Sequence, residues 1–131
     1  MIHDKDYIIR MVKEFSNFLS KLLLGKNEGE LEDSEMAFET QMRDIFKMSF
    51  EELASKSREE IEQMISEKDL HHQADYYDLL GNLFYFAFKK DPTNKEIALK
   101  AKTFYELWIQ KSSVFSIPIM GRITELSAVT N

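Results

Sequence analysis

The residues whose types suggest metal chemistry gather near the middle of the chain and comprise His71, His72, Asp75 and Asp78. His71 and Asp75 are four positions apart, and Asp78 follows three positions later. On an α-helix this spacing places the three side chains on one face, because residues three and four apart are neighbours. One imidazole and two carboxylates on a helix can supply part of a divalent metal site, as in metal-binding helical bundles.

Bundle sites of this kind also take ligands from a facing helix, usually through Glu-x-x-His motifs, and the sequence contains none. The alternative interpretation is that His71, Asp75 and Asp78 form the exposed polar stripe of an otherwise buried helix. We favour this alternative and expect no bound metal and no cofactor. The sequence also lacks an HExxH motif, a phosphate-binding glycine loop and a nucleophile elbow. Whether the protein is an enzyme stays open, and a function without catalysis is favoured.

The helix that must position these residues is expected to run from about residue 69 to residue 90. Its leucine, tyrosine and phenylalanine side chains spread round most of the helix. They leave a narrow polar stripe made by His71, Asp75, Asp78, Asn82 and Lys89. A helix that is apolar on most sides has neighbours on most sides. We therefore predict that it is the central helix of a bundle.

The rest of the chain also favours helices, so we predict an all-α bundle of five or six helices in a single domain, residues 1–131. Apolar periodicity and capping signals place the other elements. In the first half they are an amphipathic helix over 4–24 ending at Gly25, a linker over 26–33, a helix from Ser34 to about Met48 and a turn over 50–55. A helix over 58–66 follows, with Ser57 and Glu60 as its capping box. After the central helix come a helix capped by Thr93 that ends near Ser112 and a short last helix from about 116 with a frayed end over 128–131.

The composition of the 131-residue chain argues against several classes of protein. Its formal net charge of −6 disfavours a nucleic-acid binder, because phosphate contacts need a basic surface. The absence of cysteine excludes disulfides and thiolate metal sites. No apolar run approaches the roughly 20 residues of a membrane span, and the N-terminus does not resemble a signal peptide. We expect a cytoplasmic protein with no nucleic-acid or membrane partner.

Two surfaces are candidates for contact with another protein. The first helix carries a short heptad-like stripe, which either docks on the bundle or forms a homodimer seam; its main members are Ile8, Val12, Phe15 and Leu19. A group of lysines near the turn after the central helix either grips an acidic segment or is simply solvated; it comprises Lys89, Lys95, Lys100 and Lys102. A third set is aromatic and either lines a small-molecule pocket or belongs to the core: Tyr76, Tyr77, Tyr85, Tyr105 and Trp108.

Residues 70–112 contain aromatic, small and Leu-Gly positions in a recognisable order, namely Tyr77, Leu80, Gly81, Phe84, Ala101, Tyr105 and Trp108. This pattern resembles a tetratricopeptide repeat. The resemblance implies an antiparallel helical hairpin in which the absence of a side chain at Gly81 lets the second helix approach closely. The aromatic side chains would fill the space between the two helices.

The N-terminal segment contains Asp-Tyr-Ile-Ile-Arg at 6–10 and Phe-Leu-Ser-Lys-Leu-Leu-Leu-Gly-Lys at 18–26. It resembles the opening of a family of short uncharacterised helical proteins from Gram-positive bacteria. The resemblance implies a cytoplasmic bacterial protein and brings no catalytic residue with it.

These observations predict a protein-interaction or adaptor module that binds another protein or a second copy of itself. The residues expected at its interface are Ile8, Val12, Phe15, Leu19, Lys95 and Lys102. The alternative is a helical bundle that binds a metal or a small ligand, with enzyme activity left open.

Overall fold

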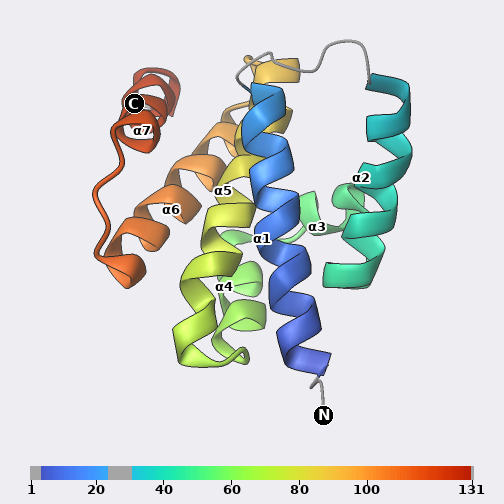
Figure 1. Cartoon of the computed structure of the whole chain (residues 1–131). Helices are drawn as coiled ribbons and strands as arrows, with labels where there is room; N and C mark the ends of the chain where they lie inside the picture. The colour runs from blue at the N-terminus through green and yellow to red at the C-terminus, as the bar shows by residue number, and fades with distance from the viewer. Residues whose placement is uncertain (1–3, 24–30, 131) are drawn as a thin grey trace.

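The computed structural model describes residues 4–23 and 31–130, and these residues form an all-α bundle (Figure 1). Their helices are α1 (Asp4–Leu23), α2 (Leu31–Phe46), α3 (Phe50–Ala54), α4 (Arg58–Ser66), the 3₁₀ turn η2 (Leu70–His72), α5 (Gln73–Lys90), α6 (Lys95–Ser112) and α7 (Ile117–Thr130). The described residues thus contain seven α-helices rather than five or six, because the predicted turn over 50–55 is itself a short helix. None of these helices is long and apolar enough to cross a membrane.

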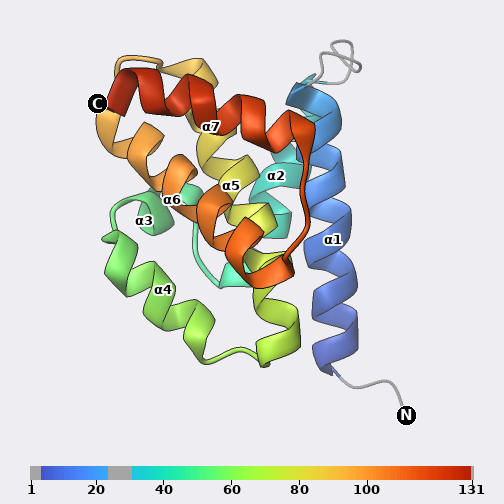
Figure 2. The same ribbon diagram turned by 90° about the vertical axis from the view of Figure 1, so that its left-hand side faces the viewer.

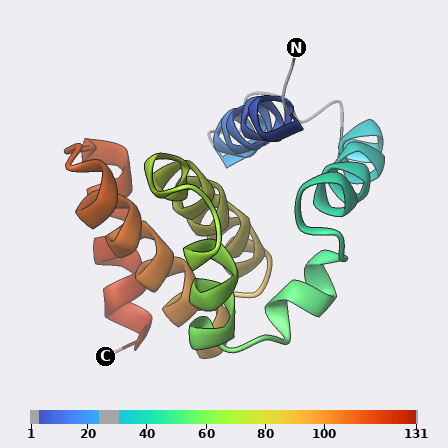
Figure 3. The same cartoon turned by 90° about the horizontal axis from the view of Figure 1, so that it is seen from below.

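The prediction that one helix forms the centre of the bundle is confirmed by α5. Seen from below, α5 lies in the middle, with α1 on one side and α6 followed by α7 on the other (Figure 3). Its closest neighbours are α6 and α1, and most of its side chains are buried. Because the connection from α5 to α6 is short, the two helices run antiparallel and pack along their length.

The central helix begins four residues later than the sequence predicts. Residues 70–72 form a 3₁₀ turn, which closes when the His72 N–H donates to the Asp69 carbonyl oxygen at 2.9 Å. The α-helical hydrogen bonds start only at Gln73, whose buried side-chain amide donates back to the Lys68 carbonyl oxygen at 3.0 Å. This bond ties the start of α5 to the end of α4, and it leaves His71 outside the helix.

Helix starts confirm one local signal and correct two others. Ser57 caps α4, and its hydroxyl and backbone form a complete capping box with Glu60. At the start of α6 the cap is Asn94 rather than Thr93, because the Asn94 side chain accepts from the Ile97 N–H at 3.2 Å. Helix α2 begins at Leu31, three residues before the predicted cap.

Helix ends show the same mixture of agreement and correction. Helix α6 ends at Ser112, as the sequence predicts. The predicted fraying over 128–131 is wrong up to Thr130, because α7 continues to that residue and Val129 packs against the core. Gly25 and most of the predicted linker lie outside the described residues.

Gly81 allows α5 and α6 to approach closely, as expected. A Cβ atom at this position would lie only 2.4 Å from the ring carbon Cδ1 of Tyr105 on α6. Nearby, the rings of Phe84 and Phe104 pack 5.5 Å apart, and those of Tyr77 and Phe104 pack 6.0 Å apart. The aromatic side chains therefore fill the space on either side of this contact and form the centre of the core.

Candidate functional site

The middle of the polar stripe, at Asp78 and Asn82 on α5, faces other helices instead of solvent. The Asn82 amide nitrogen donates to the Ser16 hydroxyl oxygen on α1 at 2.8 Å, and the Ser16 hydroxyl donates to Asp78 at 2.8 Å. The Asn82 amide oxygen accepts from the Tyr105 hydroxyl on α6 at 2.7 Å and from Arg122 Nη1 on α7 at 3.0 Å. These five residues, which we call the polar network, join α1, α5, α6 and α7. The expectation of an exposed stripe is wrong for Asp78 and Asn82, because α1 and α7 cover them.

A cavity of about 150 Å³ lies beside the polar network, between α1, α5 and the start of α7. Asp78, Asn82 and Arg122 contribute polar groups to its wall, together with Ser16 and Ser116. Ligand pockets usually occupy about 300–1,000 Å³. This cavity is therefore too small for a typical small-molecule substrate. Because the network's polar groups bind one another, it holds the four helices in register.

The partly buried position of Asp78 predicts a distinctive pH dependence of stability. Burial raises the pKa of Asp78 above the ordinary value of 3.8, against the opposing effect of the Ser16 hydrogen bond. The unfolded chain therefore releases this proton at a lower pH than the folded chain does. The stabilising contribution of Asp78 is complete at pH values below 3.8 and is lost as the pH rises through the folded-state pKa.

We expect that Asp78→Asn, which keeps an oxygen acceptor for Ser16, does not lose stability in this way as the pH rises. Urea unfolding between pH 3 and pH 7 measures the free energy of unfolding of both proteins. The variant should gain stability relative to the wild type as the pH rises across this interval. Asp44→Asn removes an exposed carboxylate and is the matched control. A difference between Asp78→Asn and wild type that stays constant or shrinks with rising pH contradicts the prediction.

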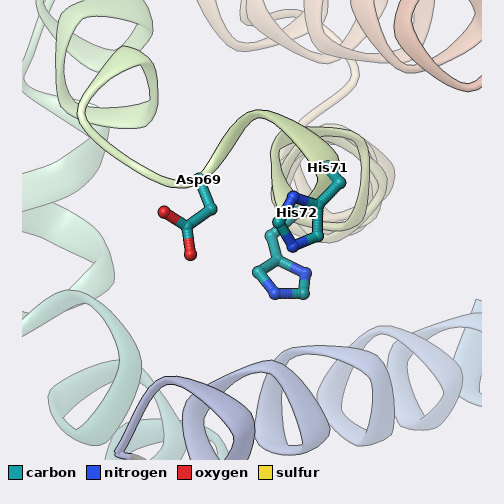
Figure 4. A group of neighbouring side chains, drawn as sticks. All are labelled: Asp69, His71 and His72. Atoms are coloured by element: carbon teal, nitrogen blue, oxygen red, sulfur yellow. The ribbon is translucent and has the colours of Figure 1, made fainter.

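The structure does not place His71, Asp75 and Asp78 on one helix face. His71 is exposed in η2, Asp75 lies in the first turn of α5, and Asp78 is bound to Ser16. Among the described residues, the side chains whose potential ligand atoms all lie within 4.8 Å of one another are Asp69, His71 and His72. Figure 4 shows the carboxyl group and the two imidazole rings around this turn. The sequence-based set therefore missed Asp69, which the pattern Asp-x-His-His could have indicated.

A pocket of about 470 Å³ opens beside this turn, between α1, α2, α4 and α5. Its volume falls within the usual range for small-molecule sites. The charged and polar residues of its lining are Lys47, Glu67, Lys68, Asp69 and His72. Its walls are mainly apolar and consist of Ile8, Ile9, Ile45, Phe46, Met64, Ile65 and Tyr76.

The first helix uses its apolar stripe within the chain. Val12, Phe15 and Leu19 are each at most 1 % exposed, and the Phe15 ring packs 5.5 Å from Phe38 on α2. Ile8 is half-buried in the wall of the 470 Å³ pocket. The homodimer seam is therefore wrong, because α5 and α2 already cover this stripe, and the docked outer helix is the arrangement observed.

The lysine group separates into exposed and buried members. Lys100 is only 7 % exposed, and its ammonium group donates to the Ala54 carbonyl oxygen at 2.6 Å, near the end of α3. It therefore belongs to the core and not to a solvated basic surface. Lys95 is exposed at the start of α6, and Lys102 is half-buried. Their role in binding an acidic segment stays a prediction.

The tyrosines do not converge on one pocket. Tyr85 donates its hydroxyl to Glu125 at 2.5 Å, Tyr105 belongs to the polar network, and burial raises the pKa of Tyr77 to about 12. Tyr76 lines the 470 Å³ pocket, and Trp108 is half-buried against the core. The core interpretation of this aromatic set is therefore correct for its buried members.

A solvent-exposed apolar surface lies where α6 passes into α7, and sequence reasoning missed it. Phe115 and Ile117 are each 75 % exposed, Val114 is 49 % exposed and Met120 is 38 % exposed. We call these four residues the connector surface. Helix α6 ends in the left-handed conformation of Ser113, and an extended stretch then leads to α7 (Figure 2). The apolar run at a helix break was the available signal.

No family model matches the sequence, and neither the curated proteins nor the solved structures contain a match to it. The resemblance of the first 26 residues to a family of short helical proteins therefore stays a prediction. The same holds for the cytoplasmic location and the bacterial origin.

Proposed function

We propose that this protein is a small interaction module that binds an apolar segment of another protein on the connector surface. The observation that supports this function is the exposure of four large apolar side chains within seven consecutive positions, 114–120. The largest apolar patch on a typical monomer covers about 300–600 Å² and is often a binding site. The adaptor function predicted from the sequence is thereby kept, and its interface moves from α1 to the end of the chain.

The size of the connector surface favours a short segment as the partner. From their exposed fractions, its four side chains present on the order of 400 Å² to solvent. This is about half of the ~800 Å² that each partner buries in a stable protein–protein interface. The interface of a homodimer formed through this surface alone would therefore be too small to be stable. A peptide with two or three apolar anchors matches the available area.

The charge around the connector surface indicates what flanks those anchors. Residues 107–124 contain no aspartate or glutamate, whereas Lys111 and Arg122 lie within them. The whole chain has a net charge of −6, so this region is locally depleted of acids. We infer that the partner segment carries acidic residues beside its apolar anchors, because such charges would increase the rate of association.

A peptide-display selection against the full chain tests this function. We expect enriched peptides to contain apolar anchors next to Asp or Glu. The double substitution Phe115→Ser and Ile117→Ser should weaken binding of a selected peptide at least about tenfold, because each buried anchor contributes more than about 1 kcal/mol. Leu70→Ser is the matched control, since Leu70 is 77 % exposed on a different part of the surface.

Other results would contradict the proposal. Peptides that bind the double variant as tightly as the wild type would place the interface elsewhere. Analytical ultracentrifugation gives the second arm of the test. A dimer that is lost in the double variant would mean that the connector surface binds a second copy of the chain, which overturns the peptide proposal.

The tetratricopeptide-like character of the hairpin is also a proposal. It is supported by the burial of Tyr77, Leu80, Phe84 and Ala101 around the contact between Gly81 and Tyr105.

A second candidate function is the binding of a small apolar molecule in the 470 Å³ pocket. The pocket's volume and its mainly aliphatic wall favour this alternative.

A further inference from the structure

We propose that Asp69, His71 and His72 bind one divalent transition-metal ion of the Zn²⁺ or Ni²⁺ type. The inference is independent of the connector surface, which involves α6 and α7. Its basis is the convergence of one carboxylate and two imidazoles, whose potential ligand atoms all lie within 4.8 Å of one another. Small rotations of these side chains can bring the three donor atoms to the 2.0–2.2 Å distances at which zinc is bound.

The local backbone explains why these side chains meet. Asp69 directly precedes the 3₁₀ turn, and His72 is its last residue, so one turn of backbone separates them. The hydrogen bond from the His72 N–H to the Asp69 carbonyl oxygen closes this turn at 2.9 Å. His71 then lies beside His72, and the centres of their rings are 4.2 Å apart. The spacing of the ligands is therefore built into the turn.

The turn is also held at both ends. Helix α4 precedes it and α5 follows it, and the Gln73 side chain ties the two by donating to the Lys68 carbonyl oxygen. The nearby ammonium group of Lys68 is directed to the ring of Tyr76, 5.4 Å from its centre. A turn fixed in this way loses little conformational freedom when its side chains bind an ion.

The donor types indicate which ions are bound. Imidazole nitrogen suits Zn²⁺, Ni²⁺ and Cu²⁺, whereas Mg²⁺ and Ca²⁺ prefer sites made only of oxygen ligands. Three protein ligands leave at least one coordination position for water. His71 is exposed, so an ion can enter from solvent, and Asp69 and His72 border the 470 Å³ pocket. The site therefore lies at the edge of that pocket.

Isothermal titration of the metal-free full chain with ZnCl₂ and with NiCl₂, at one fixed pH near neutrality, tests the proposal. We expect one ion per chain. His71→Ala, His72→Ala and Asp69→Asn should each weaken binding at least about tenfold, since each removes one of three ligands. The chain has three histidines, so His3→Ala is the matched control and should bind as the wild type does. Circular dichroism establishes that each variant keeps its helices.

Cobalt absorption provides a second measurement that does not depend on stability. Co²⁺ bound by the wild type should show visible bands that are absent from His72→Ala. The proposal is overturned if no metal binds, or if His71→Ala and His72→Ala bind as tightly as the wild type. It is also overturned if His3→Ala abolishes binding, because the site would then involve the N-terminal segment. Unchanged binding by Asp69→Asn would remove the carboxylate from the ligand set and overturn the three-ligand site.

Discussion

Gly81→Ala is expected to lower the free energy of unfolding by at least about 2 kcal/mol, although alanine is the better helix former. The added methyl group would lie 2.4 Å from Cδ1 and 2.6 Å from Cε1 of the Tyr105 ring. This ring cannot move away cheaply, because its hydroxyl donates to Asn82 and accepts from Arg122. The clash must therefore separate α5 from α6 or break the polar network.

Urea unfolding of Gly81→Ala measures this loss, and Gly121→Ala is its matched control. Gly121 is also helical, but a Cβ atom there meets nothing within 4 Å. We expect Gly121→Ala to stabilise the protein by about 0.5–1 kcal/mol, since alanine has the higher helix propensity. Equal effects of the two substitutions would mean that the approach of α5 to α6 at Gly81 does not limit the size of the residue.

Asn82→Ala is expected to cost about 3 kcal/mol, the larger part of which comes from the groups left without a partner. Asn82 is 3 % exposed and bonds to Ser16, Tyr105 and Arg122 on three other helices. Each buried polar group that loses its hydrogen bond costs about 1–3 kcal/mol. The Tyr105 hydroxyl, which is buried, loses its acceptor, whereas the half-buried Arg122 keeps its bond to that hydroxyl.

A double-mutant cycle with Tyr105→Phe separates the contribution of the network's hydrogen bonds to stability from the contribution of side-chain packing. Tyr105→Phe keeps the ring and removes the hydroxyl that joins Asn82 and Arg122. Because the two substitutions interrupt the same hydrogen bonds, their combined effect should be smaller than the sum of the single effects by about 1 kcal/mol or more. Asn17→Ala, on the exposed side of α1, should change stability by less than about 0.5 kcal/mol. Strict additivity of Asn82→Ala and Tyr105→Phe would mean that the network is not a cooperative unit.

The polar network also bears on the proposed interaction surface. The connector surface spans the connection from α6 to α7 and the start of α7, and Arg122 joins α7 to α5 and α6. Farther along α7, Glu125 accepts hydrogen bonds from Tyr85 and Lys89, each at 2.5 Å. These contacts, with the buried Ile119 and Leu126, hold α7 on the bundle. A partner segment would therefore meet apolar side chains that are already in place.

The amino-acid sequence by itself determined the helical class, the central position of α5 and the positions of most helices. The physical reason is that these properties depend on local signals. Apolar periodicity over about four turns defines the buried face of a helix, and the Ser57 capping box needs only residues three positions apart. The close contact at Gly81 was also predictable, because a small residue in an aromatic helix marks a place where another helix approaches.

Only the tertiary structure decided what the polar residues do. The partners of Asn82 lie 66 positions away at Ser16 and 40 positions away at Arg122. No local pattern distinguishes such a buried stripe from a solvated one, so the sequence placed Asp78 and Asn82 in water. The same reason applies to Lys100, whose partner Ala54 is 46 positions away. Phe115 and Ile117 are the opposite case, because their side chains are apolar and the helices of residues 4–23 and 31–130 leave them 75 % exposed.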